Sequence, residues 1–73
     1  MSLIGLTGTV TMRIPGGEDD PGEISLTVKG RSDLHVAYSN EPIEIGQPVL
    51  VIGVRGPLNV TVEPWMLEPT LAL

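Results

Sequence analysis

Polar and apolar residues alternate along most of this chain, and the alternation predicts strands rather than helices. It is clearest in the segments 6–14, 23–29 and 58–63, where nearly every second residue is apolar. A strand with this pattern has one buried and one solvated face. Gly8 interrupts the apolar row of the first segment, and a glycine there indicates a bulge or a sharply coiled strand.

The segment 48–54 is different, because six consecutive apolar or small residues follow Pro48. The run predicts a strand buried on both faces, around which the other strands wrap. Proline is tolerated at the first residue of a strand, where its missing N–H costs little. Gly46 just before it suits a left-handed residue that closes a short turn.

The segment 34–39 is a strand whose facing is ambiguous. Leu34, Val36 and Tyr38 form one row, and the smaller residues His35, Ala37 and Ser39 form the other. A shift of one residue would exchange core and surface. Small side chains fit inside a tight barrel, so we favour Ala37 inward and Tyr38 outward.

The breaks between these segments are rich in glycine, proline and acidic residues. We expect an exposed loop at 15–22 and turns at 30–33 and 55–57. The acids at 18–20 could suggest calcium, but ligands at the required spacing and a distant bidentate Glu are not evident. A solvated loop is the better interpretation.

Five short strands with a coiled first strand indicate an all-β fold: a small closed five-stranded antiparallel barrel, similar to an OB-fold but lacking its usual helix. The connection at 40–47 has room for one helical turn at most. The expected barrel spans 3–65, with residues 1–2 as an added or disordered start and 66–73 as a C-terminal tail. Its expected core includes these residues: Val10, Leu26, Ala37, Val51 and Val60.

Composition narrows the possible functions. The chain has 73 residues, no cysteine and a formal net charge of −5, so it forms one domain without disulfides or thiolate metal sites. Four basic residues among nine acids do not favour general binding of nucleic acid or anionic lipid. The longest apolar run is far shorter than the roughly 20 residues of a membrane-spanning helix.

The sequence shows no arrangement of catalytic residues. His35 is the only histidine, Lys29 is the only lysine, and no serine stands in a nucleophile motif. We therefore predict no enzyme activity, no cofactor and no metal. The alternative is a barrel that binds single-stranded nucleic acid by stacking bases on Tyr38, Trp65 and His35, which the acidic charge disfavours.

The apolar residues exceed what a small barrel can enclose. If Ala37 points inward, one row of the third strand and one row of the fourth face solvent, and Trp65 adds to them. Exposed apolar residues on a small domain suggest a partner surface. The candidate interaction surface comprises Val36, Tyr38, Leu50, Ile52 and Trp65; the alternative is that the tail folds back over it.

The spacing of glycines and apolar residues resembles a known family. It runs Leu3-Ile4-Gly5-x-x-Gly8-x-Val10, then Ala37-x-Ser39-x-x-Pro42-Ile43-x-x-Gly46-x-x-Val49-x-Val51, then Val60-x-Val62-x-Pro64. It is similar to the C-terminal soluble domain of NfeD-like proteins, over residues 3–65. A large aromatic residue often stands where this chain has His35.

The resemblance implies a fold and a setting rather than a reaction. Such domains are OB-fold-like barrels that normally follow transmembrane helices, and long members add a serine protease domain from which no residue carries over here. They are thought to act with stomatin, prohibitin or flotillin-type membrane scaffolds. We thus expect a non-enzymatic interaction module, cytoplasmic and tethered through a segment absent here, either an excised domain or a short soluble member, with self-association as a further option.

Overall fold

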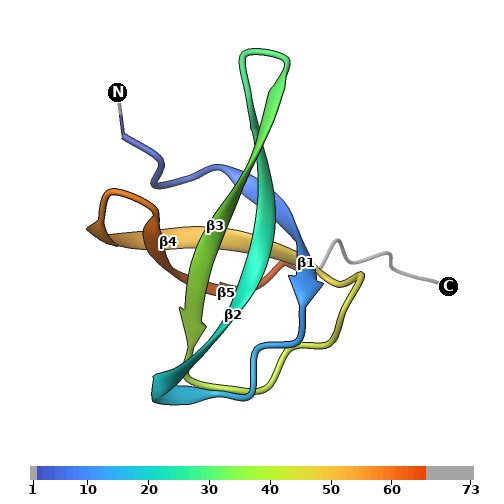
Figure 1. Cartoon of the computed structure of the whole chain (residues 1–73), viewed down its shortest axis with the longest axis vertical. Coiled ribbons are helices and arrows are strands. Elements are labelled where there is room, and N and C mark those ends of the chain that lie inside the picture. Colours follow the sequence, from blue (N-terminus) through green and yellow to red (C-terminus); the bar gives the residue numbers. More distant parts are fainter. Residues whose placement is uncertain (1, 66–73) are drawn as a thin grey trace, which may run out of the picture.

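The computed structural model describes residues 2–65 as a closed barrel of five strands without a helix (Figure 1). Around the barrel the order is β1-β2-β3-β5-β4. The strands are β1 (Thr7–Met12), β2 (Gly17–Val28), β3 (Arg31–Ser39), β4 (Pro48–Gly56) and β5 (Asn59–Pro64). The expected closed five-stranded barrel without a helix is therefore confirmed. The expected tail at 66–73 lies outside the described residues.

One strand pair differs from the antiparallel expectation. β3 and β5 run parallel, with Ala37 opposite Val60 and Tyr38 opposite Thr61. The other four pairs are antiparallel. The alternation of residues cannot reveal strand direction, because it reports only which side chains are buried. The parallel pair closes the barrel.

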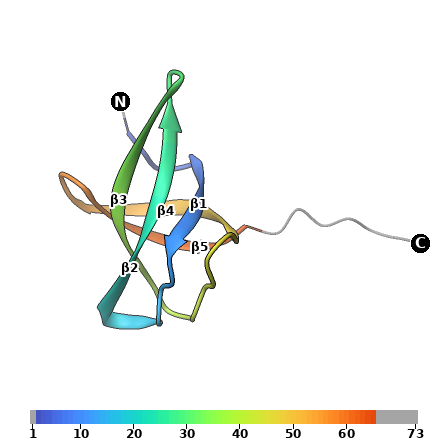
Figure 2. The ribbon, with the colours of Figure 1, turned by 45° about the vertical axis from the view of Figure 1, so that its right-hand side comes forward.

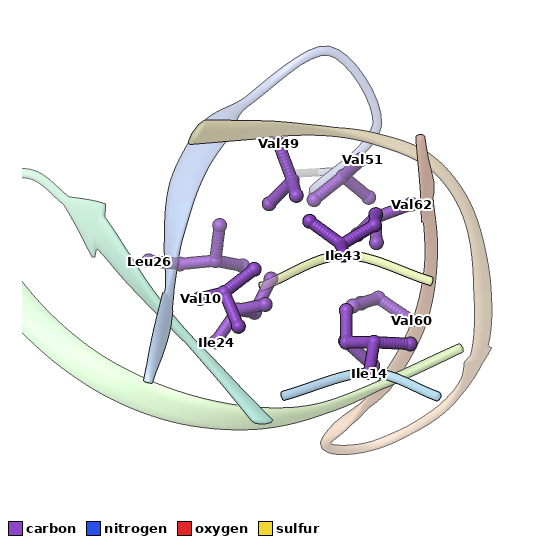
Figure 3. Packing of buried hydrophobic residues seen from close by; sticks show 10 residues of the cluster. Val10, Ile14, Ile24, Leu26, Ile43, Val49, Val51, Val60 and Val62 are labelled. Atoms are coloured by element: carbon purple, nitrogen blue, oxygen red, sulfur yellow. The ribbon is translucent and has the colours of Figure 1, made fainter. Parts of the chain in front are cut away.

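The interior of the barrel is filled by aliphatic side chains (Figure 3). All five residues expected in the core are at most 1% exposed. Ile14 and Ile43 join them through an isolated bridge between the segments that follow β1 and β3. The full cluster is Val10, Ile14, Ile24, Leu26, Ala37, Ile43, Val49, Val51, Val60 and Val62. Valine and isoleucine suit such a core because branched side chains pack well on a pleated sheet.

The β2–β3 hairpin is longer than the sequence indicated. β2 begins at Gly17, so most of the expected loop at 15–22 is an exposed, irregular strand whose register with β3 shifts between Gly17 and Gly22. The turn consists of Lys29 and Gly30, both with positive φ, rather than residues 30–33. Positive φ at both central residues is typical of a type I′ turn. The end of this hairpin projects from the barrel in both views (Figures 1 and 2).

The connection from β3 to β4 ends in a tight turn. The N–H of Gln47 donates to the carbonyl of Glu44 at 3.1 Å, and Gly46 has a φ of +91°. This agrees with the left-handed glycine predicted at that position. The turn places Pro48 at the start of β4, as expected, while the β4–β5 turn falls on residues 57–58 rather than 55–57.

The prediction that β4 is buried on both faces is wrong. Val49 and Val51 point into the barrel, whereas Leu50 is half-buried and Ile52 is 45% exposed. Each wall of a barrel has one inner and one outer face, and nothing covers the outer face of β4 within the described chain. The long apolar run thus combines a core row with a surface row.

Two glycines are required by close packing. A Cβ on Gly8 would lie 2.6 Å from the carbonyl oxygen of Ser25, and one on Gly22 would lie 2.5 Å from those of Met12 and Arg13. Both distances are shorter than van der Waals contact. The irregularity in β1 itself falls between Val10 and Met12, not at Gly8.

Candidate functional site

The facing of β3 is as predicted. His35, Ala37 and Ser39 are buried, whereas Val36 and Tyr38 lie on the outer surface. Because β5 lies between β3 and β4 in the barrel, the outer faces of these three strands form one continuous wall. We call it the β3–β5–β4 wall. It carries four of the five residues of the predicted surface: Val36, Tyr38, Leu50 and Ile52.

A polar row separates the apolar residues on this wall. The outward positions of β5 are Asn59, Thr61 and Glu63, and the register places Thr61 between Tyr38 of β3 and Gly53 of β4. Neighbouring strands lie about 4.8 Å apart, so this row holds the two apolar groups roughly 10 Å from each other. The wall is therefore apolar at its two sides and polar along its middle.

Tyr38 is not a free aromatic side chain. The guanidinium carbon of Arg55 lies 4.0 Å from the centre of its ring, a cation–π contact. The Nε of Arg55 donates to the hydroxyl of Thr61 at 3.0 Å, and its Nη1 donates to the carbonyl of Glu18 at 3.4 Å. Arg55 thus links β4, β5, β3 and the beginning of β2 across the outside of the wall.

Sequence reasoning placed Arg55 in a turn and assigned it no role on this surface. The observed β4 extends to Gly56, and its register with β5 shifts between Val54 and Gly56. The irregularity brings Arg55 over Thr61. No pattern of apolar and polar residues signals such a bulge, so only the geometry reveals this contact.

Trp65 follows β5 and lies beside the start of β4. Its backbone N–H donates to the carbonyl of Pro48 at 3.0 Å. Its side chain, 38% exposed, lines an open hollow of about 330 Å³ over β1 and β2. The lining consists of Thr7, Gly8, Thr9, Ser25, Thr27, Pro48 and Trp65. The hollow adjoins the wall, because Thr7 in its lining pairs with Leu50 of β4. The fifth residue of the predicted surface therefore borders the wall.

The basic residues do not form a groove. Arg13 pairs with Glu44 at 2.8 Å, Arg55 covers Tyr38, and Lys29 and Arg31 lie at the tip of the β2–β3 hairpin. His35 is buried, with its Nδ1 3.4 Å from the carbonyl of Asp33. The residues proposed for base stacking, Tyr38, Trp65 and His35, are thus on the wall, at the hollow and in the interior, respectively.

The described residues contain no group of three or more His, Cys, Asp or Glu placed to hold a metal ion. Within 2–65 there is also no helix of the length and apolarity needed to cross a bilayer. The acids at 18–20 lie on the exposed, irregular beginning of β2. The features with possible functional meaning in this part of the chain are therefore surfaces: the wall, the hollow and the hairpin.

Fold and surface together define a class: a small closed barrel of the OB type, with a helix-free connection between its third and fourth strands. The family of this barrel follows from comparison with known proteins. Residues 7–63 match the sequence model of the NfeD C-terminal domain. The chain belongs to this family. No match to a curated protein was found.

Similar solved structures include the following two. One is the C-terminal domain of stomatin operon partner protein 1510-C from Pyrococcus horikoshii, 32% identical, with a TM-score of 0.68 over 88% of this chain and 89% of that one. The other is the soluble domain of the NfeD protein YuaF from Bacillus subtilis, 29% identical, with a TM-score of 0.71 over 90% and 75%. Each of the two matches covers about nine-tenths of this chain.

Proposed function

We propose that this domain is a non-enzymatic interaction module that binds a stomatin-type membrane scaffold protein. The observation that carries the proposal is the β3–β5–β4 wall, whose outer face leaves Ile52 45% exposed beside the half-buried Leu50. Adjacent exposed apolar side chains on a small domain are a common mark of a protein contact surface. The similarity to a stomatin operon partner protein supports a scaffold of this kind.

The same family membership supports a membrane-associated setting. In this view the barrel does not enter the bilayer, and its role is to present the wall to a scaffold assembled at the membrane. Val36, Leu50 and Ile52 supply apolar contact area. Tyr38 and Arg55 form a preassembled pair at one side of it, which adds an aromatic and a cationic group, the two types enriched at interface hot spots.

Binding of nucleic acid is the less well supported alternative. A binding groove needs cations that track the phosphates beside aromatic rings that stack on the bases. Here one face of Tyr38 is occupied by Arg55, and Arg13 is engaged by Glu44. Because the cations and the aromatic rings do not line one groove, an interaction module is the better supported function.

The test is binding of the purified domain to a stomatin-type protein, measured for Ile52→Ser and for a matched variant, Ile45→Ser. Ile45 is 66% exposed and lies in the turn before β4, away from the wall. We expect Ile52→Ser to weaken binding about tenfold, as loss of one packed aliphatic contact would, and Ile45→Ser to bind like the unchanged domain. Equal binding by all three proteins would remove the wall from the site.

A further variant tests the contribution of the aromatic ring. Tyr38→Ala should reduce affinity about thirtyfold if the ring is a hot spot. Unfolding curves measured alongside separate lost contact from lost structure. A Tyr38→Ala domain that unfolds at much lower denaturant would show that the ring mainly stabilises the barrel.

A further inference from the structure

The β2–β3 hairpin has an open edge. β3 pairs with β2 along its whole length, from Arg31 to Ser39. On its other side it pairs with β5 only from Val36 to Tyr38. In residues 2–65 no further strand pairs with the segment 31–34, which is exposed throughout. Such an edge presents backbone donors and acceptors that another strand can join.

The hydrogen bonds of β3 identify which groups are open. The N–H of Val36 points toward β5, where it donates to the carbonyl of Leu58 at 2.7 Å. Along a strand, alternate residues direct both of their backbone groups to the same side. The N–H and C=O of Leu34 and Ser32 therefore point to the same side as those of Val36, beyond the point where β5 begins.

We propose that this edge pairs with the same edge of a second copy, so that two hairpins form one antiparallel four-stranded ribbon. The two-fold axis passes beside Ser32, which exchanges both backbone hydrogen bonds with Ser32 of the second copy. Residues of β3 are then opposite when their numbers sum to 64. An interface of this type is isologous and closes at two copies.

Charge selects this register. Arg31 and Asp33 lie on the same face of β3, and their exposed side chains come within 4.0 Å of each other. In the proposed register Arg31 lies opposite Asp33 of the second copy, which forms two cross-strand ion pairs. A shift of two residues would instead place Asp33 opposite Asp33, and like charges directly opposite each other are unfavourable.

The ends of the edge also fit. Leu34, 54% exposed, lies opposite Gly30 of the second copy, which has no side chain to obstruct it. The second hairpin turns away at Lys29, before it would meet Leu58 in the turn that precedes β5. The length of the open edge therefore matches the length of strand that a second copy offers. A contact this short is weak. Its detection requires a method that traps the dimer covalently.

Disulfide trapping provides that method, because the chain contains no cysteine. Directly opposite residues in a hydrogen-bonded pair have Cα atoms about 5.5 Å apart, within the usual disulfide range. We expect Ser32→Cys to form disulfide-linked dimers under mild oxidation at least tenfold faster than Thr11→Cys at the same concentration. Thr11 is an exposed outer residue of β1 and serves as the matched control.

Charge variants of the trapped protein test the register. Asp33→Arg, added to Ser32→Cys, places Arg31 opposite an arginine and should reduce the rate to that of the control. Arg31→Asp together with Asp33→Arg exchanges the charges and should restore it. Equal rates for Ser32→Cys and Thr11→Cys, or an unchanged rate with Asp33→Arg, would overturn the proposal.

A measurement on the unsubstituted chain guards against a folding artefact. As the concentration rises, amide chemical shifts at residues 30–35 should move while those of β1 stay constant; shifts that stay constant everywhere would also overturn the proposal. This pairing goes beyond the proposed function and uses a different part of β3 from the wall. Because no scaffold protein is present in these experiments, their failure would leave the scaffold proposal standing.

Discussion

The guanidinium of Arg55 stacks on the ring of Tyr38, with 4.0 Å between its central carbon and the ring centre. The two residues belong to β4 and β3, which are not neighbours in the barrel. Their contact passes over Thr61 of β5, whose hydroxyl accepts a hydrogen bond from Arg55. The pair thus connects β3 and β4 on the outside of the barrel, across β5 and its parallel pairing with β3.

The energy of this contact can be measured with a double-mutant cycle. Exposed cation–π contacts contribute about 0.5–1 kcal/mol, so Tyr38→Leu and Arg55→Gln should show a coupling of that size in urea unfolding. A matched pair, Tyr38→Leu with Arg13→Gln, should show none, because Arg13 is engaged by Glu44 instead. Additive effects of Tyr38→Leu and Arg55→Gln would mean that the stacking contributes nothing to stability.

A charge on the inner face of β4 should cost far more stability than a charge on its outer face. Val51→Asp buries a carboxylate that has no partner in the core, which costs several kcal/mol, comparable to the whole stability of a small domain. Ile52→Asp places the same group on the outer surface and should cost less than about 1 kcal/mol. Thermal unfolding followed by circular dichroism distinguishes them: we expect a cooperative transition only for Ile52→Asp. A transition for Val51→Asp at the unchanged midpoint would contradict the assignment of Val51 to the core.

Close packing makes Gly22 irreplaceable. A methyl group there would meet two backbone oxygens at 2.5 Å, so Gly22→Ala should destabilise the barrel by more than about 2 kcal/mol. At Gly53 the nearest atom to an added Cβ is 3.7 Å away, so Gly53→Ala should be neutral or stabilising. The stability changes of both variants are measured from the midpoints of urea unfolding. Equal effects at the two positions would contradict the close approach of Gly22 to the carbonyl oxygens of Met12 and Arg13.

The hairpin turn offers a stabilising change. Lys29 has a φ of 54°, which is unfavourable for lysine and well tolerated by asparagine. Asn-Gly is the preferred pair in type I′ turns, so Lys29→Asn should stabilise the domain by about 0.5 kcal/mol, in the range typical of turn optimisation. The comparison is Lys29→Ala, which keeps the strain and removes the same charge. A lower urea midpoint for Lys29→Asn than for Lys29→Ala would rule out this turn type.

The dispersed cations predict weak affinity for nucleic acid. In low salt, single-stranded DNA of mixed sequence should produce no saturable change in the fluorescence of Trp65 at micromolar concentrations, because no basic groove tracks the phosphates. A matched titration with the Glu18→Lys, Asp19→Lys variant shows whether added positive charge alone creates binding. Micromolar, salt-sensitive binding by the unchanged chain would revive the alternative function.

Much of the fold is predictable from residue alternation, since burial of one strand face imposes a period of two. The core residues Val10, Leu26 and Val60 follow from it. The inward Ala37 and outward Tyr38 do not, because both rows of β3 contain apolar residues; their facing follows from the small size of Ala37. Strand direction does not follow from alternation either, so the parallel β3–β5 pair was missed. The beginning of β2 was also missed, because glycine, proline and acids usually signal a loop and here form an irregular, exposed strand end.

The surface was predictable only in part. The strand period of two places Leu50 and Ile52 on one face of β4 and Val49 and Val51 on the other, but both rows are apolar, so the sequence does not show which row is outside. It cannot place Trp65, which follows the last strand and whose position depends on a backbone hydrogen bond to Pro48. It also cannot reveal the open edge of β3, which depends on where β5 starts to pair.

The parallel seam between β3 and β5 has a consequence for the order of folding. β5 is the last strand along the described chain, yet it must insert between β3 and β4 before the wall is complete. During synthesis, β1 to β4 emerge first, and they cannot enclose the core until Val60 and Val62 have left the ribosome. Contacts between distant segments slow folding, and domains dominated by them fold in milliseconds to seconds rather than microseconds. The nascent chain therefore passes through an interval in which its first four strands are exposed.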